Sequence, residues 1–318
     1  MVKVLIIIIL VTQIFSPAII TGIDSKSGTA ALSFLKIGVG ARPVAMGESY
    51  VGISDDSTAL YWNPAGLAQI ERLQGTFMHN MWLENIIYDY IGAVSPLEQF
   101  SEIFIGYIGG ISITTLNTGT IEGYDINNNP YNYSASDFAI GISIAKIIAY
   151  DQIFVGSTFK YISEQIESCN GATFGIDIGG IYKLSYQLSL GAAIQNIGPG
   201  IKFVSQEHSQ PMNIKIGLGY KSPEYLDHPY IVAIDLNKPI DNTFRLSFGG
   251  EYTLNPIFKI RAGYKLGSFD DLDGLTGFTF GFGTNFVVGT GTGLFVDCAF
   301  APYGNLGSTF RISVTLKF

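Results

Sequence analysis

The sequence is poor in charged residues, cysteine and histidine. Charged residues make up 14% of its 318 residues, against about 25% in soluble domains. Two cysteines and three histidines do not make a convincing zinc site. The net charge of −8 argues against a nucleic-acid partner. Cys169 lies in a polar loop and Cys298 within a predicted strand, so we do not expect a disulfide between them.

Long apolar runs are missing after the N-terminus. Mean hydropathy is +0.31, yet no run approaches the ~18 residues that signal a transmembrane helix. The longest candidate, "FAIGISIAKIIAY", is interrupted by Lys146. An apolar chain without such runs is typical of a transmembrane β-barrel, because the barrel's apolar residues occupy alternate positions.

The first 22 residues resemble a secretory signal peptide. Lys3 supplies the positive start, residues 4–15 supply the apolar core, and Ala18 offers a small residue for cleavage. The alternative is a membrane-anchor helix. We therefore predict export through the inner membrane and residence in the cell outer membrane.

Alternating apolar and polar residues predict strands from residue 73 to residue 318. In "FRLSFGGEY", Phe248 and Tyr252 fall on one face, and Ser247 and Glu251 fall on the other. A soluble β-sandwich would share this period, but here the polar faces carry charges in strand after strand, which is typical of a barrel lumen. These charges are Lys160, Asp177, Lys215, Asp235, Arg245, Glu251, Lys259, Arg261, Asp297 and Arg311.

The predicted fold class is all-β, an antiparallel transmembrane β-barrel of about 14 strands, an even number as bacterial barrels require. The expected strands are 74–81, 86–96, 102–115, 137–147, 152–163, 172–183, 188–196, 212–220, 229–237, 244–253, 257–266, 276–287, 293–301 and 308–318.

The last predicted strand ends on an aromatic residue. Apolar residues stand at every second position before that end. This pattern resembles the signal read by the outer-membrane assembly machinery, although a strand can end on phenylalanine by chance. The predicted assembly signal consists of Phe310, Ile312, Val314, Leu316 and Phe318.

Residues 23–72 precede the barrel and are predicted to plug it. A barrel of about 14 strands is too wide for its own side chains to fill, which leaves an open pore or a plugged lumen. In "WNPAG", Asn63 precedes a proline, is pushed away from helical geometry and can cap the next turn, where Pro64 suits the first position. The predicted plug motif consists of Asp55, Asp56, Trp62, Asn63, Pro64 and Gly66.

Two further features of this segment are expected. A short helix is allowed from Thr29 onward. The acidic pair Asp55 and Asp56 is expected to contact lumen cations such as Arg245 or Arg261.

Four stretches carry a family resemblance. "FLKIGVGARPVAMGESYVGISDDSTALYWNPAGLA", residues 34–68, resembles the N-terminal signature of the PorV/PorQ family of outer-membrane proteins, distant relatives of the FadL-type barrels. "GTIEGYDINNNP", "SASDFAIGISIA" and "QNIGPGIKF" are similar to other segments of that family. The resemblance implies a barrel with an N-terminal hatch and a part in type IX protein secretion. Its partners would be outer-membrane lipid, secreted cargo proteins and secretion subunits, and the barrel would act as one docking platform that uses extracellular loops such as 116–136 and 221–229.

Two other functions remain open at this point. A FadL-like barrel would instead transport hydrophobic solutes across the outer membrane. The solute would leave the barrel at a Gly-rich, kinked strand near the plug. This hydrophobic small molecule would bind an apolar pocket formed by Phe34, Leu35, Met46, Tyr61 and Trp62. The third possibility is a structural outer-membrane protein without cargo.

Catalytic and cofactor sites are not predicted. The spacing of Asp125, Asn127 and Asn129 is similar to an EF-hand loop, but Pro130 replaces the required glycine and Ser136 the final glutamate. No serine lies in a nucleophile-elbow context, so we expect no enzyme activity, no catalytic residue, no metal and no cofactor.

Overall fold

A computed structural model describes residues 27–149, 152–203, 205–267, 276–289 and 291–318. The predicted signal peptide lies outside these described residues. Among the described residues, no helix is both long and apolar enough to cross a membrane.

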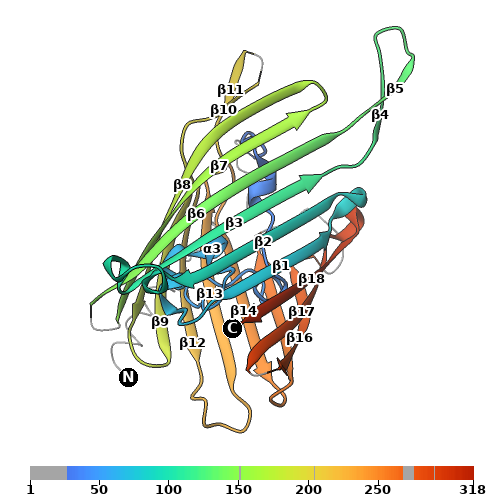
Figure 1. The fold of residues 1–318 in the computed structure, drawn as a ribbon. Helices are drawn as coiled ribbons and strands as arrows, with labels where there is room; N and C mark the ends of the chain where they lie inside the picture. Colours follow the sequence, from blue (N-terminus) through green and yellow to red (C-terminus); the bar gives the residue numbers. More distant parts are fainter. Residues whose placement is uncertain (1–26, 150–151, 204, 268–275, 290) are drawn as a thin grey trace.

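Fourteen strands form one closed antiparallel barrel, in which each strand pairs with the next and the first pairs with the last (Figure 1). The prediction of a barrel, rather than a sandwich, is confirmed. The barrel strands are β1 (Gln74–Met81), β2 (Ile87–Pro96), β3 (Tyr107–Asn117), β6 (Ala135–Ala149), β7 (Ile153–Ile166), β8 (Cys169–Lys183), β9 (Leu188–Ile197), β12 (Asn213–Lys221), β13 (Tyr230–Pro239), β14 (Arg245–Thr253), β15 (Phe258–Leu266), β16 (Phe278–Val288), β17 (Thr292–Pro302) and β18 (Ser308–Lys317).

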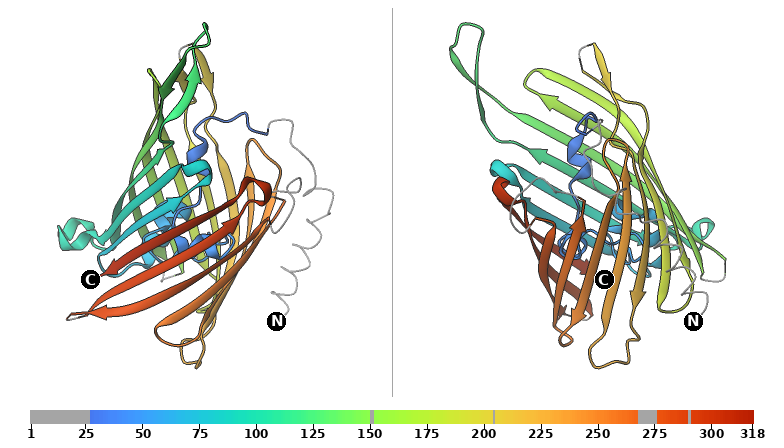
Figure 2. Two further views of the ribbon diagram at one scale, coloured as in Figure 1. Left: turned by 90° about the vertical axis from the view of Figure 1, so that its right-hand side faces the viewer. Right: turned by 180° about the vertical axis from the view of Figure 1, so that it is seen from behind.

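The third strand starts later than predicted. The 3-10 helix η6 (Glu102–Phe104) replaces its expected beginning, and with the preceding η5 (Leu97–Gln99) it projects outward from the barrel (Figure 2). Ser101 caps η6 by accepting the N–H of Ile103. The prediction was wrong here because the apolar residues of this connection continue the alternating pattern of β3.

Four short strands lie outside the barrel in two hairpins. These are β4 (Ile121–Tyr124) with β5 (Pro130–Tyr133), and β10 (Ile201–Phe203) with β11 (Gln206–His208). Both hairpins belong to connections at the same end of the barrel, which we call the loop end. The terminal end is the opposite one, where β1 begins and β18 ends. Outer-membrane barrels have short periplasmic turns and longer extracellular loops, so we infer that the loop end faces outward.

The two expected docking loops do not lie together. Five barrel strands separate the connection 118–134 from the connection 222–229, and an odd number of antiparallel strands places them at opposite ends. Residues 222–229 therefore belong to the terminal end. The expectation of one platform built from both loops was wrong, because it took no account of strand parity.

The barrel has an apolar outer face, and its inner face is polar except where residues such as Tyr88, Tyr90 and Ile162 pack in an apolar cluster with residues 32–39. Phe248 and Tyr252 are 39% and 40% exposed, whereas Glu251 between them is 3% exposed. The same alternation holds in β18, where Phe310, Ile312 and Leu316 point outward and Arg311 is buried. The predicted assembly signal thus lies mostly on the lipid-facing side, and its role in assembly stays a prediction.

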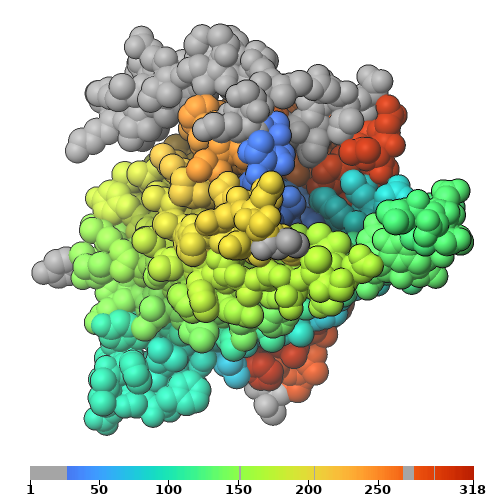
Figure 3. All heavy atoms as spheres, turned by 90° about the horizontal axis from the view of Figure 1, so that it is seen from above, coloured from blue at the N-terminus to red at the C-terminus, as the bar shows by residue number. Residues whose placement is uncertain are grey.

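The segment before β1 lies inside the barrel, as the views in Figures 2 and 3 show. We call residues 27–72 the hatch segment. Near the loop end, Ala31 donates its N–H to the carbonyl of Ser209, and the segment then runs toward the terminal end to reach β1. Its short helices are η2 (Ser33–Lys36), α2 (Ala41–Ala45), α3 (Ala59–Trp62) and η3 (Pro64–Gln69). The helix expected from Thr29 is therefore a single 3-10 turn that starts later.

Glycines on the inner wall let the hatch backbone approach it closely. A Cβ added at Gly263 of β15 would overlap the backbone nitrogen of Gly47, and one at Gly179 of β8 would overlap the side chain of Asn63. Within the hatch, a Cβ at Gly66 would overlap the carbonyl of Ser54. These glycines therefore allow backbone segments to pack directly against one another.

We expect Gly263→Val to displace the hatch segment, because the new side chain needs space that the hatch backbone fills. Overpacking of this kind costs about 1–3 kcal/mol. Limited proteolysis of the detergent-solubilised protein should then cleave within the hatch segment faster than in the parent. Ala262→Val adds similar bulk on the exposed, lipid-facing side of the same strand and should leave cleavage unchanged. Equal cleavage of the two variants would contradict this account.

Candidate functional site

The "WNPAG" turn fixes the hatch to the barrel wall. Asn63 has extended backbone, and its side-chain oxygen accepts the N–H of Ala65 at the start of η3. Its amide nitrogen donates to the carbonyls of Val51, at 2.9 Å, and Gly180 of β8, at 3.2 Å. Trp62 is fully buried and donates its indole N–H to the carbonyl of Val39 at 2.8 Å. The turn thus caps a helix and joins the hatch to β8 at the same time.

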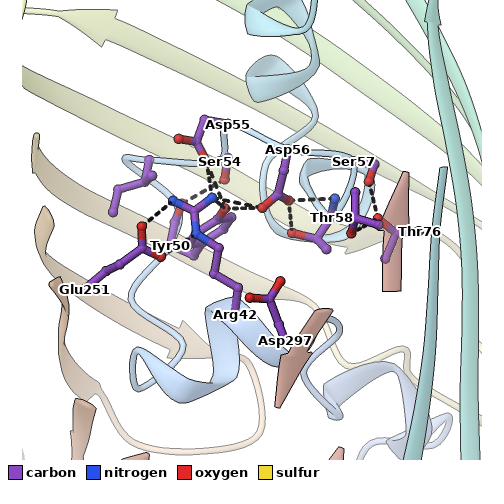
Figure 4. A network of polar contacts seen from close by, with 12 residues as sticks. Arg42, Tyr50, Ser54, Asp55, Asp56, Ser57, Thr58, Thr76, Glu251 and Asp297 are labelled. Atoms are coloured by element: carbon purple, nitrogen blue, oxygen red, sulfur yellow. Dashed lines mark hydrogen bonds and ion pairs between the residues drawn. The ribbon is translucent and has the colours of Figure 1, made fainter. Parts of the chain in front are cut away.

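The acidic pair of the hatch contacts Arg42 (Figure 4). A terminal nitrogen of Arg42 lies 2.6 Å from Asp55 and 3.0 Å from Asp56, and its Nε lies 2.8 Å from Glu251 of β14. Neither Arg245 nor Arg261, the expected partners, holds this pair. Sequence reasoning missed Arg42 because it lies 13 and 14 residues before the two acids and only the fold brings them together.

The wall extends this charge network. Glu251 also binds Arg261 at 2.7 Å, Arg261 binds Asp297 at 2.6 Å, and Lys221 reaches Asp55 at 2.7 Å. Buried charges are costly unless they are paired and hydrogen-bonded. We call this set of six side chains and Asp56 the latch, because it joins the hatch segment to β12, β14, β15 and β17.

Side chains of the wall also accept backbone N–H groups of the hatch. Asp235 of β13 accepts from Tyr50 at 2.8 Å and from Val51 at 2.9 Å. Thr279 of β16 accepts from Gly47 at 2.9 Å, and Ser313 of β18 accepts from Ala41 at 2.8 Å. The irregular hatch backbone is thereby satisfied by the barrel, as buried polar groups require.

The five residues of the expected apolar pocket do not line one common space. Phe34 and Leu35 pack in one apolar cluster, and Met46 and Trp62 pack in another. Tyr61 lies between these clusters, touching both. Of the five, only Leu35 and Tyr61 border the lumen cavity of about 240 Å³. Whether any of the five binds a ligand stays untested.

A cavity of about 240 Å³ lies beside the hatch segment toward the loop end. Its lining is mixed, with apolar groups such as Leu35 and Ile37 beside four basic and two acidic side chains. These are Lys36, Lys215, Arg245 and Lys265, with Glu48 and Asp241. Trp82, Pro211 and Tyr303, which belong to loop-end connections, form its rim.

A second, apolar hollow of about 390 Å³ lies on the outer face of β2, β3 and β6. Small residues of neighbouring strands, among them Ala93 and Gly109, form its floor, and Ile111, Ile142 and Ile144 its rim. On the lumen side, Leu60 of the hatch packs directly against Gly110. The hatch therefore covers the wall behind this hollow.

The remaining candidates form no site. Cys169 and Cys298 are both free, in agreement with the expectation. Asp125 uses its carboxylate to accept N–H groups of Asn127 and Asn129 within its own loop. Within the described ranges, no cluster of three or more histidine, cysteine or acidic side chains is arranged to hold a metal.

A family model described as "Type IX secretion system protein PorV" matches residues 21–240 of this sequence. The chain belongs to the PorV family. No curated protein matches it.

Several solved outer-membrane barrels have the same fold as this PorV-family chain. The toluene transporter TodX of Pseudomonas putida is 13% identical, with a TM-score of 0.57 over 88% of this chain and 97% of that one. The toluene transporter TbuX of Ralstonia pickettii is 12% identical, with a TM-score of 0.56 over 88% and 97%. A FadL homologue of Pseudomonas aeruginosa is 10% identical, with a TM-score of 0.52 over 94% and 98%. At such low identity the likeness shows a shared fold of outer-membrane barrels, and no more.

Removing the acceptor on β13 should loosen the hatch of this PorV-family protein. Asp235→Ala leaves the N–H groups of Tyr50 and Val51 buried without an acceptor, at a cost of about 1–3 kcal/mol each. We expect faster proteolysis of the hatch and a lower free energy of unfolding in urea. Asp235→Asn keeps one side-chain acceptor, so its free energy of unfolding should fall less. Asp227→Ala removes an exposed carboxylate at the terminal end and is the matched control. Parent-like stability of Asp235→Ala would refute this role.

Acid should release the hatch only at low pH. Burial acts to raise the pKa of the Asp55 carboxyl, but Arg42 and Lys221 outweigh it and hold that pKa well below its usual range. Such a group stabilises the folded state above its unfolded pKa, near ~3.9, and this contribution is lost as pH falls through the folded value. Hydrogen exchange of the hatch amides, corrected for intrinsic rates, should show constant protection down to about pH 4 and a decline below it.

The control for this pH effect is Asp55→Asn. This variant cannot change its charge at that position, so its protection should be weaker at neutral pH and should decline less in acid. A loss of protection already near neutral pH in the parent would contradict the assignment to Asp55.

Proposed function

We propose that this protein is a docking component of protein secretion, which binds secreted cargo or secretion subunits at the outer membrane. The observation that carries the proposal is the match to the PorV family over residues 21–240. The proposal contains no catalytic step, and it requires a rigid surface that a protein partner can recognise.

The β4–β5 hairpin supplies such a surface. It stands away from the barrel at the loop end (Figures 1 and 3). Tyr124 and Tyr131 are 64% and 40% exposed, and the ring of Tyr131 lies 5.8 Å from that of Tyr133. Aromatic residues are enriched in protein interfaces, because they offer a large contact area together with a polar group.

The tip of this hairpin is held in one conformation. The Asp125 carboxylate accepts hydrogen bonds from the side chain and backbone of Asn129 and from the backbone of Asn127, and these bonds lower the pKa of Asp125. A pre-ordered loop loses less conformational entropy when it binds. The "DINNNP" stretch therefore supports a recognition hairpin rather than a cation site.

The filled lumen favours binding of a protein partner over conduction of solutes through the barrel. The hatch lies across the barrel interior, and the latch and the contacts of Asp235 and Asn63 attach it to several strands. A partner would then be engaged by the rim of the barrel, where the hairpin lies, while the hatch keeps the membrane sealed.

The hairpin tyrosines give a direct test in a strain that lacks the parent gene. A plasmid copy carrying Tyr124→Ser and Tyr131→Ser should leave secreted cargo in the periplasm, measured as the cell-surface to periplasm ratio by immunoblotting. We expect this ratio to fall about tenfold, which corresponds to about 1.4 kcal/mol of lost binding. Tyr186→Ser removes a fully exposed tyrosine, 101% accessible, from the β8–β9 turn at the terminal end and is the matched control. Normal delivery by the double variant, at parent levels of barrel in the outer membrane, would oppose hairpin docking.

Transport of hydrophobic solutes is the second candidate, favoured by the apolar hollow beside Gly109 and Gly110. The exit was expected to be a Gly-rich, kinked strand near the plug, and Gly109 and Gly110 belong to β3, a strand next to the hatch. Leu60 covers the lumen side, so transport would require the hatch to move there. Uptake of a labelled monoaromatic hydrocarbon that rises in Leu60→Ala cells, with unchanged cargo delivery, would favour this alternative.

A further inference from the structure

One row of polar side chains faces the lumen cavity. The strand register sets Lys215 of β12 opposite Asn237 of β13, and Asn237 opposite Arg245 of β14. All three line the cavity. Because neighbouring strands lie about 4.8 Å apart, this row brings two cationic groups and an amide onto one side of the same space.

Lys215 is buried and makes no contact ion pair with a described carboxylate, while the charges of Glu48, Asp235 and Asp177 act on it from farther away. The residue as a whole is 5% exposed. Its ammonium group lies 4.5 Å from the centre of the Trp62 ring and 5.7 Å from that of Tyr61. Among the described residues it forms no ion pair and no hydrogen bond. A buried ammonium group is costly unless an anion or an acceptor compensates it, and the two rings supply only part of that compensation.

Two of the four cations that line the cavity have a described carboxylate at contact distance, and two do not. Lys36 is paired with Asp241, and Lys265 is paired with Glu48. The Nε of Arg245 is buried and has no hydrogen-bond partner in the described part of the chain. Within the described ranges, two of the four cations therefore have no contact ion pair, in a protein whose net charge is −8.

Acceptors without partners lie beside these cations. The side-chain oxygens of Asn213 and Asn237 are buried, and neither receives a hydrogen bond from the residues that the structure describes. Both residues line the cavity. Unsatisfied buried groups of opposite character, next to one another in a cavity, indicate a ligand that carries both an anionic group and hydrogen-bond donors.

We propose that the cavity beside the hatch binds a small organic oxyanion, a carboxylate or a phosphate ester that also carries hydroxyl or amine groups. Lys215 and Arg245 hold the oxyanion, and Asn213 and Asn237 accept from the donor groups. The ligand enters from the loop end, where Trp82 and Tyr303 border the cavity. With about 240 Å³, the site is smaller than the ~300–1,000 Å³ of drug-sized pockets, which suits a small metabolite rather than a polymer.

The two tryptophans of the chain provide the first readout. Trp62 contacts Lys215, and Trp82 lines the same cavity. Inorganic phosphate and succinate are titrated separately into the full-length protein in detergent, at constant ionic strength, and chloride serves as the reference anion. We expect a saturable change in tryptophan fluorescence with at least one of the two oxyanions and none with chloride. Saturation by phosphate alone would assign a phosphate ligand, and saturation by succinate alone a carboxylate.

Equilibrium dialysis with labelled phosphate and labelled succinate gives a second readout that does not depend on tryptophan. Lys215→Met and Arg245→Gln should each weaken binding at least tenfold. Lys202→Met, which removes an exposed cation outside the cavity, should bind as the parent does. Folding of each variant is checked by its heat-dependent migration in SDS gels.

Three outcomes would overturn the proposal. The first is no saturable binding of either oxyanion. The second is an equal response to chloride, which would show only general screening. The third is parent-like affinity in both folded cavity variants. None of these outcomes bears on cargo delivery, so the proposed docking function would stand or fall separately.

Discussion

The structure depends on one constraint, which is that irregular backbone enclosed by a barrel must find its hydrogen-bond partners on the barrel wall. The hatch segment has only short helices, so many of its N–H groups have no partner within a helix. The wall supplies Asp235, Thr279 and Ser313 as acceptors. It also supplies glycines such as Gly263, where the two backbones meet without a side chain between them. The wall and the hatch therefore specify each other.

The latch follows from the same constraint. Inward-facing positions of a wide barrel are polar, and charges placed there need partners because burial makes isolated charges expensive. Glu251 is surrounded by Arg42 of the hatch and by Arg261 of the wall. A single hatch arginine thus compensates acids from both parts. Such a network fixes the position of the hatch in the barrel more than it adds to the free energy of unfolding, because the cost of burying each charge offsets much of the attraction between them.

Sequence patterns predict the wall well and its contents less well. Period-two alternation identifies all fourteen barrel strands, because successive residues of each strand face lipid and the barrel interior in turn. The sequence also indicates the capping position of Asn63, since that signal is local. By contrast, the partner of Asp55 and Asp56 depends on how the hatch folds back on itself, and the Lys215–Asn237–Arg245 row depends on strand register. Neither relation leaves a local pattern that can be read along the chain.

A fold shared with toluene transporters does not by itself imply their function. Function has to be argued from how the lumen of this chain is filled. Phe34, Met46 and Trp62 are buried in the packing of the hatch, so the aromatic residues that would suit an apolar ligand instead stabilise the hatch. The space that remains beside it is lined by lysine, arginine and asparagine side chains together with apolar groups such as Leu35 and Ile37. An apolar solute would gain little by leaving lipid for such a cavity, because it would displace water from polar groups and offer them no hydrogen bonds in return. The apolar surface available to solutes is outside the barrel, whereas the polar chemistry is inside, next to the loop end.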